Sequence, residues 1–476
     1  MKRFSLPRGG LTSLFVASLA LMAMGGRALA DAASDAATAA AAAAATAAAA
    51  ATAAAPAAAA AAPKIDTGDT AWMLTATALV LMMTIPGLAL FYGGMVRKKN
   101  VLATVAQSFG ATCVITVLWM VMCYSIAFTS NDNATLNQYI GGFNYLFLAP
   151  MGLNAVSALA PTIPESVYMT YQMTFAIITP ALIAGALADR MKFSAFMVFM
   201  SLWLIFVYSP IAHWVWGGGW LGTLGALDYA GGTVVHLNAG VAGLVTCLML
   251  GKRKGYGTEN MAPHNLVLSL TGASLLWVGW FGFNAGSAVT SNVNAGMAMA
   301  ATQIATAAAA MGWMGMEWII HKKPSVLGMI SGAVAGLVAI TPASGFVNPM
   351  GALLIGIAAG IVCFLAAVYM KKFFGYDDAL DAWGVHGVGG ALGAMLTGVF
   401  ASKAINATGA PNGGWLIDGN FGQMLIQLYD VLAVFAWSGI GTFIILKLID
   451  MVIGIRVSPE VEVEGLDINL HGETVQ

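Results

Sequence analysis

The sequence predicts an all-α membrane protein with eleven transmembrane helices, arranged as a pseudo-twofold five-plus-five inverted repeat plus one extra helix. Composition is the first reason. Of 476 residues, 59% are hydrophobic and only 9% are charged, and the mean hydropathy is +0.81. Soluble domains carry about 25% charged residues because their surface faces water. Charge this sparse cannot cover a soluble globule of this size, so most of the surface is expected to face lipid.

A series of long apolar runs is the second reason. Each is close to the ~20 residues that a helix needs to cross a bilayer core of ~30 Å. Within them, the pairs Gly332/Gly336 and Gly356/Gly360 have the spacing typical of close helix contacts. The runs cover residues 70–93, 101–128, 167–188, 193–214, 231–251, 264–286, 293–318, 325–345, 350–370, 383–402 and 423–450.

The distribution of Lys and Arg between these runs is the third reason. Basic clusters follow the first, third, fifth, seventh, ninth and eleventh runs, beginning with Arg97-Lys98-Lys99. The intervening connections contain Lys403 alone. Because Lys and Arg favour cytoplasmic loops, this alternation predicts a mature N-terminus outside and a C-terminus in the cytoplasm. The expected location is the inner (plasma) membrane.

The N-terminus has the features of a signal peptide over residues 1–30. A positively charged start is followed by apolar Leu11 to Met24 and by Ala28-Leu29-Ala30, a small-residue cleavage site. Residues 31–66 are then an Ala-rich low-complexity linker. The alternative is an uncleaved first span, which would add one helix.

Residues 67–450 are predicted to form the transmembrane domain and residues 451–476 a cytosolic regulatory tail. An odd number of spans suits an inverted repeat with one additional helix. The sequence offers limited support: Ala-Leu-Asp ending at Asp228 precedes His236, and Ala-Leu-Asp ending at Asp381 precedes His386. We therefore expect Asp381, near Asp377 and Asp378, to be the inner-side counterpart of Asp228, first as part of a solvated acidic loop and second with a role in an inner vestibule. With this pairing the Asp-to-His spacings are eight and five, so the segments do not align residue for residue.

His236 and His386 both lie well inside apolar, Gly-rich runs. Ionisable side chains in such positions cost several kcal/mol, so each needs a partner or a function. One interpretation is two unrelated neutral imidazoles, each bonded to a backbone carbonyl. Their comparable positions in the fifth span of each half favour a shared axial site. A neutral, mutually hydrogen-bonded pair there could accept or pass a proton.

Asp228 and the tryptophans each have an ordinary explanation and a functional one. Asp228 is predicted first as a helix N-cap, and second as a carboxylate that attracts cations. Most Trp residues in membrane proteins form interfacial belts. An aromatic face also attracts a cation, however, and phenyl rings beyond it would exclude hydrated ions.

Several classes of function receive no support from the sequence. The net charge is −1 and no basic stripe is present, so nucleic-acid binding is not expected. The four cysteines lack metal-ligand spacing, and no nucleophile–base pair stands outside the spans. We therefore expect no enzymatic activity, no cofactor and no metal site.

Four segments resemble the signatures of the ammonium transporter family (Amt/Mep/Rh). They are Phe91-Tyr92-Gly93-Gly94, Gly231 to Asn238, Gly279 to Ser287, and Gly384-Val385-His386-Gly387. The similarity runs from about residue 68 to Glu473 and is to the bacterial type of the Amt branch, which the tryptophan at Trp216 favours over the Rhesus type. The resemblance implies eleven helices in pseudo-twofold halves, assembled as a homotrimer with one pore per subunit.

The resemblance also implies roles for individual residues. Phe175, Trp216 and Ser287 match the outer site that binds the substrate, and Phe175 with Phe283 matches a phenyl gate beneath it. His236 and His386 match the twin histidines of the pore and its proton relay. Asp228 matches the acidic residue near the outer site. The substrate would be ammonium or ammonia, with methylammonium as an analogue.

The tail segment Glu464 to Glu473 resembles the family's cytosolic C-terminus. This implies regulation by a PII-type nitrogen regulatory protein. A second reading therefore makes the chain a sensor that reports ammonium through its tail. A third, a secondary transporter for another small solute, would require broken helices and a polar midplane site, which the sequence does not suggest.

The expected mechanism follows from the cost of moving a cation through a dry pore, which is tens of kcal/mol by Born solvation. We expect ammonium to lose its proton below the outer site and NH3 to pass through the apolar section. The proton would move separately, with the two histidines as a relay. Potassium cannot lose a proton, so it would be excluded.

Overall fold

The structure is a computed structural model that describes residues 64–475. The predicted signal peptide and all but the end of the Ala-rich linker lie outside these residues. The described chain is helical, apart from loops and one isolated bridge between Met191 and Arg456. Helical segments occupy all eleven predicted spans, and eight of them are long and apolar enough to cross a membrane. The protein is therefore a multi-pass membrane protein, while the number of crossings stays a prediction.

Among the described residues, four long helices contain a π-helical turn between two α-helical parts, and two more begin with one. The label η marks these π turns, a further one in the tail, and the short 3-10 turns of the connections. A π turn widens the helix locally and often lies at a functional site. In chain order the elements are α3 (Thr67–Met82), η1 (Met83–Leu88), α4 (Ala89–Met95), η2 (Lys98–Asn100), α5 (Val101–Leu118), η3 (Trp119–Cys123), α6 (Tyr124–Phe128), η4 (Leu136–Gln138), η5 (Leu146–Leu148), α7 (Glu165–Leu187), α8 (Phe193–Trp203), η6 (Leu204–Tyr208), α9 (Ser209–Val215), α10 (Trp220–Leu224), η7 (Gly232–Leu237), α11 (Asn238–Leu250), α12 (Leu266–Gly286), α13 (Val293–His321), α14 (Val326–Ile340), α15 (Pro349–Leu365), η8 (Ala366–Met370), α16 (Lys371–Phe374), η9 (Trp383–Gly387), α17 (Val388–Phe400), α18 (Trp415–Asp418), α19 (Phe421–Val452), α20 (Pro459–Glu464) and η10 (Asp467–His471).

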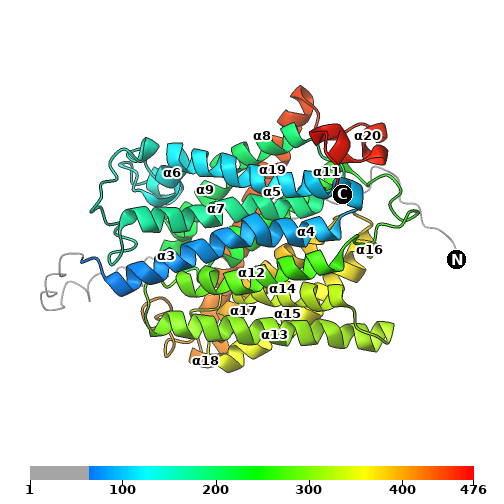
Figure 1. The fold of residues 1–476 in the computed structure, drawn as a ribbon. Helices are drawn as coiled ribbons and strands as arrows, with labels where there is room; N and C mark the ends of the chain where they lie inside the picture. The colour runs from blue at the N-terminus through cyan, green and yellow to red at the C-terminus, as the bar shows by residue number, and fades with distance from the viewer. Residues whose placement is uncertain (1–63, 476) are drawn as a thin grey trace, which may run out of the picture. The chain divides into compact units, whose positions relative to one another are not determined.

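The loops gather at two ends of the helix bundle (Figure 1). We call one the mouth end; it includes the start of α3, α18 and the long connection over residues 129–164. The opposite end, which includes α16 and α20, is the tail end. Basic loop residues of three predicted clusters illustrate this end: Arg97 and Arg253 both contact Asp189, and Arg456 donates to the Leu250 carbonyl at the end of α11.

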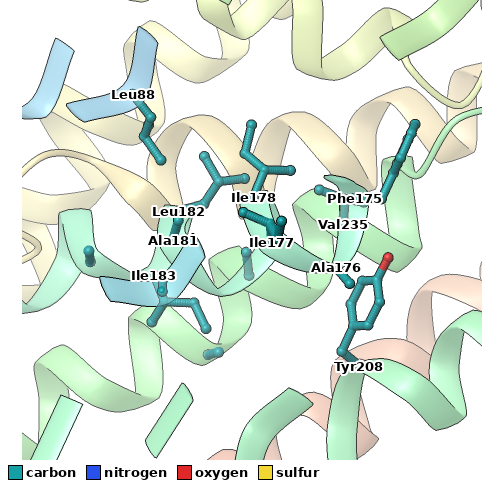
Figure 2. Packing of buried hydrophobic residues seen from close by; sticks show 14 of the residues in the cluster. Leu88, Phe175, Ala176, Ile177, Ile178, Ala181, Leu182, Ile183, Tyr208 and Val235 are labelled. Atoms are coloured by element: carbon teal, nitrogen blue, oxygen red, sulfur yellow. The ribbon is translucent and has the colours of Figure 1, made fainter. Parts of the chain in front are cut away.

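Helix α7 forms the centre of the hydrophobic core. Of its most apolar window, 89% is buried, against 33% for α19 at the periphery. Figure 2 shows α7 residues such as Ile178 and Leu182 surrounded by side chains from neighbouring helices, among them Leu88 and Tyr208. The buried residues of α7 include polar side chains such as Gln172 and Thr179, so this helix is covered by protein and not by lipid.

Glycines allow α13, α14 and α15 to pack closely. A Cβ added at Gly332 or Gly336 would lie 2.9 or 2.7 Å from a carbonyl oxygen of α13. At Gly356 and Gly360 the corresponding distance is 2.3 Å. The structure therefore confirms both predicted small-residue pairs as helix contacts, each of them with α13.

The tail segment docks on the loops of the tail end. The Asp467 carboxylate accepts hydrogen bonds from the backbone N–H groups of Leu102 and Ala103 at 3.0 and 2.8 Å, so it caps the first turn of α5. The Leu466 N–H donates to the Asn100 side chain at 2.8 Å. The Glu462 carboxylate pairs with Arg456 at 2.8 Å. These buried polar contacts hold α20 and η10 against the bundle.

Candidate functional site: an aromatic pocket above a histidine pair

A cavity of about 280 Å³ opens at the mouth end, and the three residues predicted to bind the substrate line it together. They come from three separate helices, α7, the end of α9 and the end of α12. We call this space the mouth cavity. Its lining residues are Leu159, Tyr168, Gln172, Phe175, Val215, Trp216, Tyr229, Ser287 and Val289.

Hydrogen bonds fix the aromatic and hydroxyl groups of the mouth cavity. The Trp216 indole N–H donates to the Asp228 backbone carbonyl at 2.8 Å, and its ring stands edge-on to Phe175, with centroids 5.9 Å apart and an interplanar angle of 87°. The Ser287 hydroxyl donates to the Phe283 carbonyl at 2.9 Å. Its oxygen keeps lone-pair capacity for a donor in the cavity. The cavity thus offers π faces and an acceptor, which suits a small cation.

Gln172 also lines the mouth cavity, and sequence reasoning did not single it out. Its side-chain oxygen is buried and has no hydrogen-bond partner among residues 64–475. An unpaired buried acceptor costs about 1–3 kcal/mol, unless a ligand or water supplies a donor. Its position was the available signal, because Gln172 lies three residues, about one helical turn, before Phe175 on the same helix.

Two phenyl rings close the floor of the mouth cavity. Phe175 and Phe283 stack with centroids 4.1 Å apart and an interplanar angle of 29°. Both side chains are almost completely buried. Below them, Phe283 lies 5.9 Å from the His236 ring, so the stacked pair separates the cavity from the histidines. The structure places the predicted gate residues in contact and in a closed arrangement.

The two histidines face each other in the core. Their Nδ1 atoms are 3.3 Å apart, and their rings are nearly parallel, with centroids 5.4 Å apart and an interplanar angle of 22°. Trp280 also stacks on His236, with ring centroids 5.3 Å apart. The structure excludes two separate imidazoles, each bonded to a backbone carbonyl, because the rings are partners of one another.

The Nδ1–Nδ1 contact restricts where the protons of the pair can be. One Nδ1 must donate and the other must accept, so two neutral rings are in opposite tautomers. The Nε2 atom of His236 is buried without a partner in the described chain. It therefore remains free to meet a small molecule or to change its proton.

A second, smaller cavity of about 10 Å³ lies on the tail-end side of the pair. That volume is about the space that one water molecule needs. Phe91, Tyr92, Leu380, Asp381 and His386 are among its lining residues. The histidines thus lie between two cavities.

Asp228 acts as a helix cap in this structure. Its carboxylate accepts four backbone N–H groups, from Gly231 to Val234, at 2.6–3.1 Å, together with the Thr233 hydroxyl at 2.7 Å. The predicted bonding of Asp228 to backbone amides is therefore confirmed at the start of η7, which carries His236, although the N-cap position itself is Gly231. Asp228 does not line the mouth cavity, so any effect on a cation there is exerted over a distance.

The prediction that Asp381 is the counterpart of Asp228 was wrong. The residue in the equivalent position is Asp378. Asp378 accepts hydrogen bonds from the backbone N–H groups of Ala382 and Trp383 at 3.1 and 2.7 Å, and so caps η9, which carries His386. Asp381 instead pairs with Lys371. The Asp378-to-His386 spacing is eight, the same as from Asp228 to His236.

The backbone confirms this corrected register. Gly231 and Asp381 each lie five residues before a histidine, and both have positive φ, +108° and +60°. Only a few residue types adopt this conformation readily, with Gly first and Asp among the others. The two Ala-Leu-Asp tripeptides therefore do not occupy equivalent positions. The first ends at the capping residue Asp228, and the second ends at Asp381, the residue with positive φ.

Close backbone contacts between the two histidine segments are also reciprocal. A Cβ on Gly240, four residues after His236, would lie 2.2 Å from the nitrogen of Gly387, one residue after His386. A Cβ on Gly390, four residues after His386, would lie 2.7 Å from the nitrogen of Leu237. The segments therefore cross in a locally twofold manner around the pair.

Asp377 and Asp378 lie outside the predicted spans, and their pKa values shift in opposite directions. Burial raises the pKa of Asp378 to about 6, and the charge of Asp381 adds to this effect. Burial also acts to raise the pKa of Asp377, but the hydrogen bonds and charge of Arg253 outweigh it, and the net shift is downward. Arg253 contacts Asp377 at 2.8 Å and Asp189 at 3.3 Å.

Known proteins resemble this chain over most of its length. A model described as the Ammonium Transporter Family matches residues 71–476. An ammonium transporter of Bacillus subtilis (strain 168) is 48% identical over 406 residues, 85% of this chain and 98% of that protein. One of Aquifex aeolicus (strain VF5) is 50% identical over 410 residues, 86% of this chain and 93% of that protein.

Solved structures show the same likeness. The crystal structure of Saccharomyces cerevisiae Mep2 matches with a TM-score of 0.77 at 37% identity, covering 83% of this chain and 91% of that one. A structure titled Sensor Amt Protein matches with a TM-score of 0.76 at 29% identity, covering 85% of this chain and 98% of that one.

Proposed function

This chain belongs to the ammonium transporter family, and on that premise we propose that it carries ammonium across the inner membrane by releasing the proton and conducting NH3. One observation supports the mechanism above all others. A cation-compatible mouth cavity, a closed phenyl pair and a buried histidine pair follow one another through the same helices.

In this proposal Phe175, Trp216 and Ser287, with Gln172, hold ammonium in the mouth cavity. The ion gains cation–π attraction and up to two acceptors there. Beneath it, Phe175 and Phe283 leave no room for a hydrated ion while they stack. Neutral NH3 can pass where a cation would lose its hydration without compensation.

The released proton is proposed to travel through His236 and His386. Their Nδ1 contact allows a proton to pass between the rings, and the Nε2 of His236, which has no partner among the described residues, is free to receive it. Asp228 assists by holding the helix turn that carries His236. Potassium, which has no proton to give, would be retained at the mouth. Methylammonium should be carried more slowly, because its methyl group must also pass the gate.

The remaining expectations about assembly also stand as proposals. They are a homotrimer with one pore per subunit, a mature N-terminus outside, and a cytoplasmic tail that a PII-type protein regulates. The docked position of α20 and η10 against the tail-end loops supports a tail that reports on, or acts on, the transmembrane domain.

The test is a recording on protein reconstituted in liposomes, with ammonium against potassium at several pH values. Wild type should carry ammonium-dependent current and exclude potassium. We expect His236→Ala and His386→Ala to lose ammonium-dependent current or to admit potassium. If both variants keep the wild-type selectivity and current, the histidine relay is wrong.

A second candidate function is ammonium sensing, which the likeness to a protein titled Sensor Amt Protein favours. Methylammonium uptake by a variant truncated after Arg456 separates the two. A transporter keeps measurable uptake without its tail. A protein that serves only as a sensor shows none with or without it.

A further inference from the structure

Helix α19 carries a stripe of buried polar side chains on the side that faces the pore helices. Most of them have partners: Gln427 donates to the Leu227 carbonyl at 2.9 Å, and Ser438 donates to the Asn238 carbonyl at 2.8 Å. Thr442 accepts from the Trp203 indole at 3.0 Å. These contacts explain why a helix that is largely exposed to lipid keeps a polar face.

Asp430 is the exception on this stripe. Its side chain is completely buried, and neither carboxyl oxygen has a hydrogen-bond partner within residues 64–475. It forms no ion pair with any of the described basic side chains. An ionised carboxylate in a dry site without a partner is strongly disfavoured, so the group is expected to be neutral.

Asp430 lies on α19 beside the start of η7. On the same buried face of α19, Gln427 bonds Leu227 and Ser438 bonds Asn238. Asp430 stands between those two contacts and therefore faces the segment that contains Asp228 and Thr233. The Thr233 hydroxyl already donates its proton to Asp228 at 2.7 Å. Its oxygen can still accept one, and a protonated Asp430 is the donor that this arrangement lacks.

We propose that Asp430 is a buried proton-binding site, which shares one proton with Asp228 through the hydroxyl of Thr233. In one state Asp430 is a carboxylic acid that donates to the Thr233 oxygen, and Asp228 is ionised. If the Asp430 proton moves to Thr233 while the Thr233 proton moves to Asp228, Asp430 becomes the carboxylate. The net charge of the pair is −1 in both states, and no other reactant is needed.

The energetic reason for sharing is the proximity of two carboxyl groups in a dry interior. Like charges that are close and desolvated cannot both be ionised, so the pair retains one proton. Asp228 has five donors and Asp430 has none besides this bridge, so the negative charge resides mainly on Asp228. This inference concerns proton occupancy, and it holds whether or not the proposed transport mechanism is correct.

The direct test is infrared spectroscopy of the full-length protein in lipid at neutral pH. Wild type should show a protonated carboxyl C=O band that shifts in D2O. The band should disappear in Asp430→Asn and remain in Asp450→Asn, the control on the same helix, where the side chain is exposed. A wild-type spectrum without this band, or an unchanged band in Asp430→Asn, overturns the proposal.

Two additional variants test the bridge. Thr233→Val removes the hydroxyl at nearly constant volume, so the band should stay but shift to higher frequency as the acid loses its acceptor. Thr233→Ser should keep the wild-type position. No shift in Thr233→Val shows that Asp430 does not bond to this hydroxyl. If Asp430→Asn fails to fold, ¹³C-labelled aspartate in otherwise unmodified protein identifies whether the band belongs to an aspartic acid.

Discussion

At the scale of single residues, the histidine pair is chemically asymmetric although its geometry is nearly symmetric. Two Nδ1 atoms at 3.3 Å share one hydrogen, which belongs to His236 or to His386 but not to both. A proton that enters one ring and leaves from the other reverses both tautomers. In the proposed relay, the pair would have to return to its first tautomers before it passed the next proton, and that return would be part of the transport cycle.

The tautomers can be measured directly. With ¹⁵N-labelled histidine at neutral pH, one ring of the pair should be protonated at Nδ1 and the other at Nε2. The His386→Ala variant identifies the His236 signals, which should then lose the Nδ1 coupling partner. Two rings with the same tautomer would contradict the hydrogen bond between them.

Gln172 should contribute to ammonium affinity. Its unpartnered oxygen can accept one N–H of the ion, and hydrogen bonds to charged groups contribute about 1.5–3 kcal/mol. We expect Gln172→Leu to raise the KM for ammonium about tenfold or more, with a smaller change in maximal uptake.

The control for this prediction is Gln107→Leu. Gln107 on α5 is also buried with an unpartnered side-chain oxygen, but it does not line the mouth cavity. If both substitutions change the KM equally, the effect is a general one of folding and Gln172 is not a ligand.

At the scale of elements, the two histidine segments are built to one plan. Each begins with an Asp cap eight residues before the histidine, passes a positive-φ residue at five before, and enters a π-helical turn. Two glycines four residues after the histidines let the segments cross. The position of each imidazole is therefore a property of its whole segment.

The close backbone contacts of Gly240 and Gly390 predict that substituting either glycine has a similar effect. In Gly240→Ala and in Gly390→Ala the new methyl group would meet backbone atoms of the other segment, which cannot move aside cheaply. Overpacking of this kind costs about 1–3 kcal/mol, and both variants should lower the melting temperature and ammonium uptake. Gly315→Ala on α13, where nothing lies within 4 Å, should leave both unchanged. Unequal effects of the two pore variants would argue against the twofold relation.

The cap of η9 predicts a pH dependence of stability. Since the pKa of Asp378 is raised to about 6, the folded protein holds a proton there that an unfolded chain, with a value near 4, has released. This contribution stabilises the fold below pH about 4 and is lost as pH rises to about 6. Between pH 4.5 and 7, wild type should therefore lose stability relative to Asp378→Asn.

Asp377→Asn is the matched control for that measurement. The pKa of Asp377 is lowered, so its contribution is present above pH about 4 and lost only below it. The difference from wild type should be constant between pH 5 and 7 in thermal unfolding. A slope for Asp377→Asn, or none for Asp378→Asn, would reverse the assignment of the two carboxyl groups.

At the scale of the whole molecule, the tail joins the transmembrane domain through backbone caps and buried ion pairs. Asp467 caps α5, and Asn100 beside it bonds both Leu466 and Asp189. Asp189 also contacts Arg253, which holds Asp377, the neighbour of the η9 cap. Polar contacts thus extend from the C-terminal segment to the loop before His386.

Substituting Asp467, which caps α5, should weaken the attachment of the tail segment to the helix bundle. In Asp467→Ala two N–H groups at the start of α5 lose their acceptor, which costs about 0.5–2 kcal/mol. Hydrogen exchange of residues 459–475 should become faster, while that of α7 stays slow. Glu473→Gln, an exposed tail position, is the control. Unchanged exchange in Asp467→Ala would show that other contacts hold the segment.

The sequence predicts the helical segments because hydrophobicity and loop charge act locally, and it predicts the pairing of His236 with His386. It could not place Asp378, because matching tripeptides carry no information on which residue caps a helix. It also missed Gln172 and Asp430. A buried polar residue becomes informative only when its neighbours show that it lacks a partner, and those neighbours come from distant segments.

Asp228 bonds both a ring that lines the mouth cavity and the helical turn that carries His236. Its main-chain oxygen holds the Trp216 indole, while its side chain holds the first turn of η7. One residue therefore connects the indole that lines the mouth cavity with the turn that carries His236. In the proposed transport cycle, ion binding in the cavity would change the proton affinity of the imidazoles, and by reciprocity their protonation would change ion affinity by the same free energy.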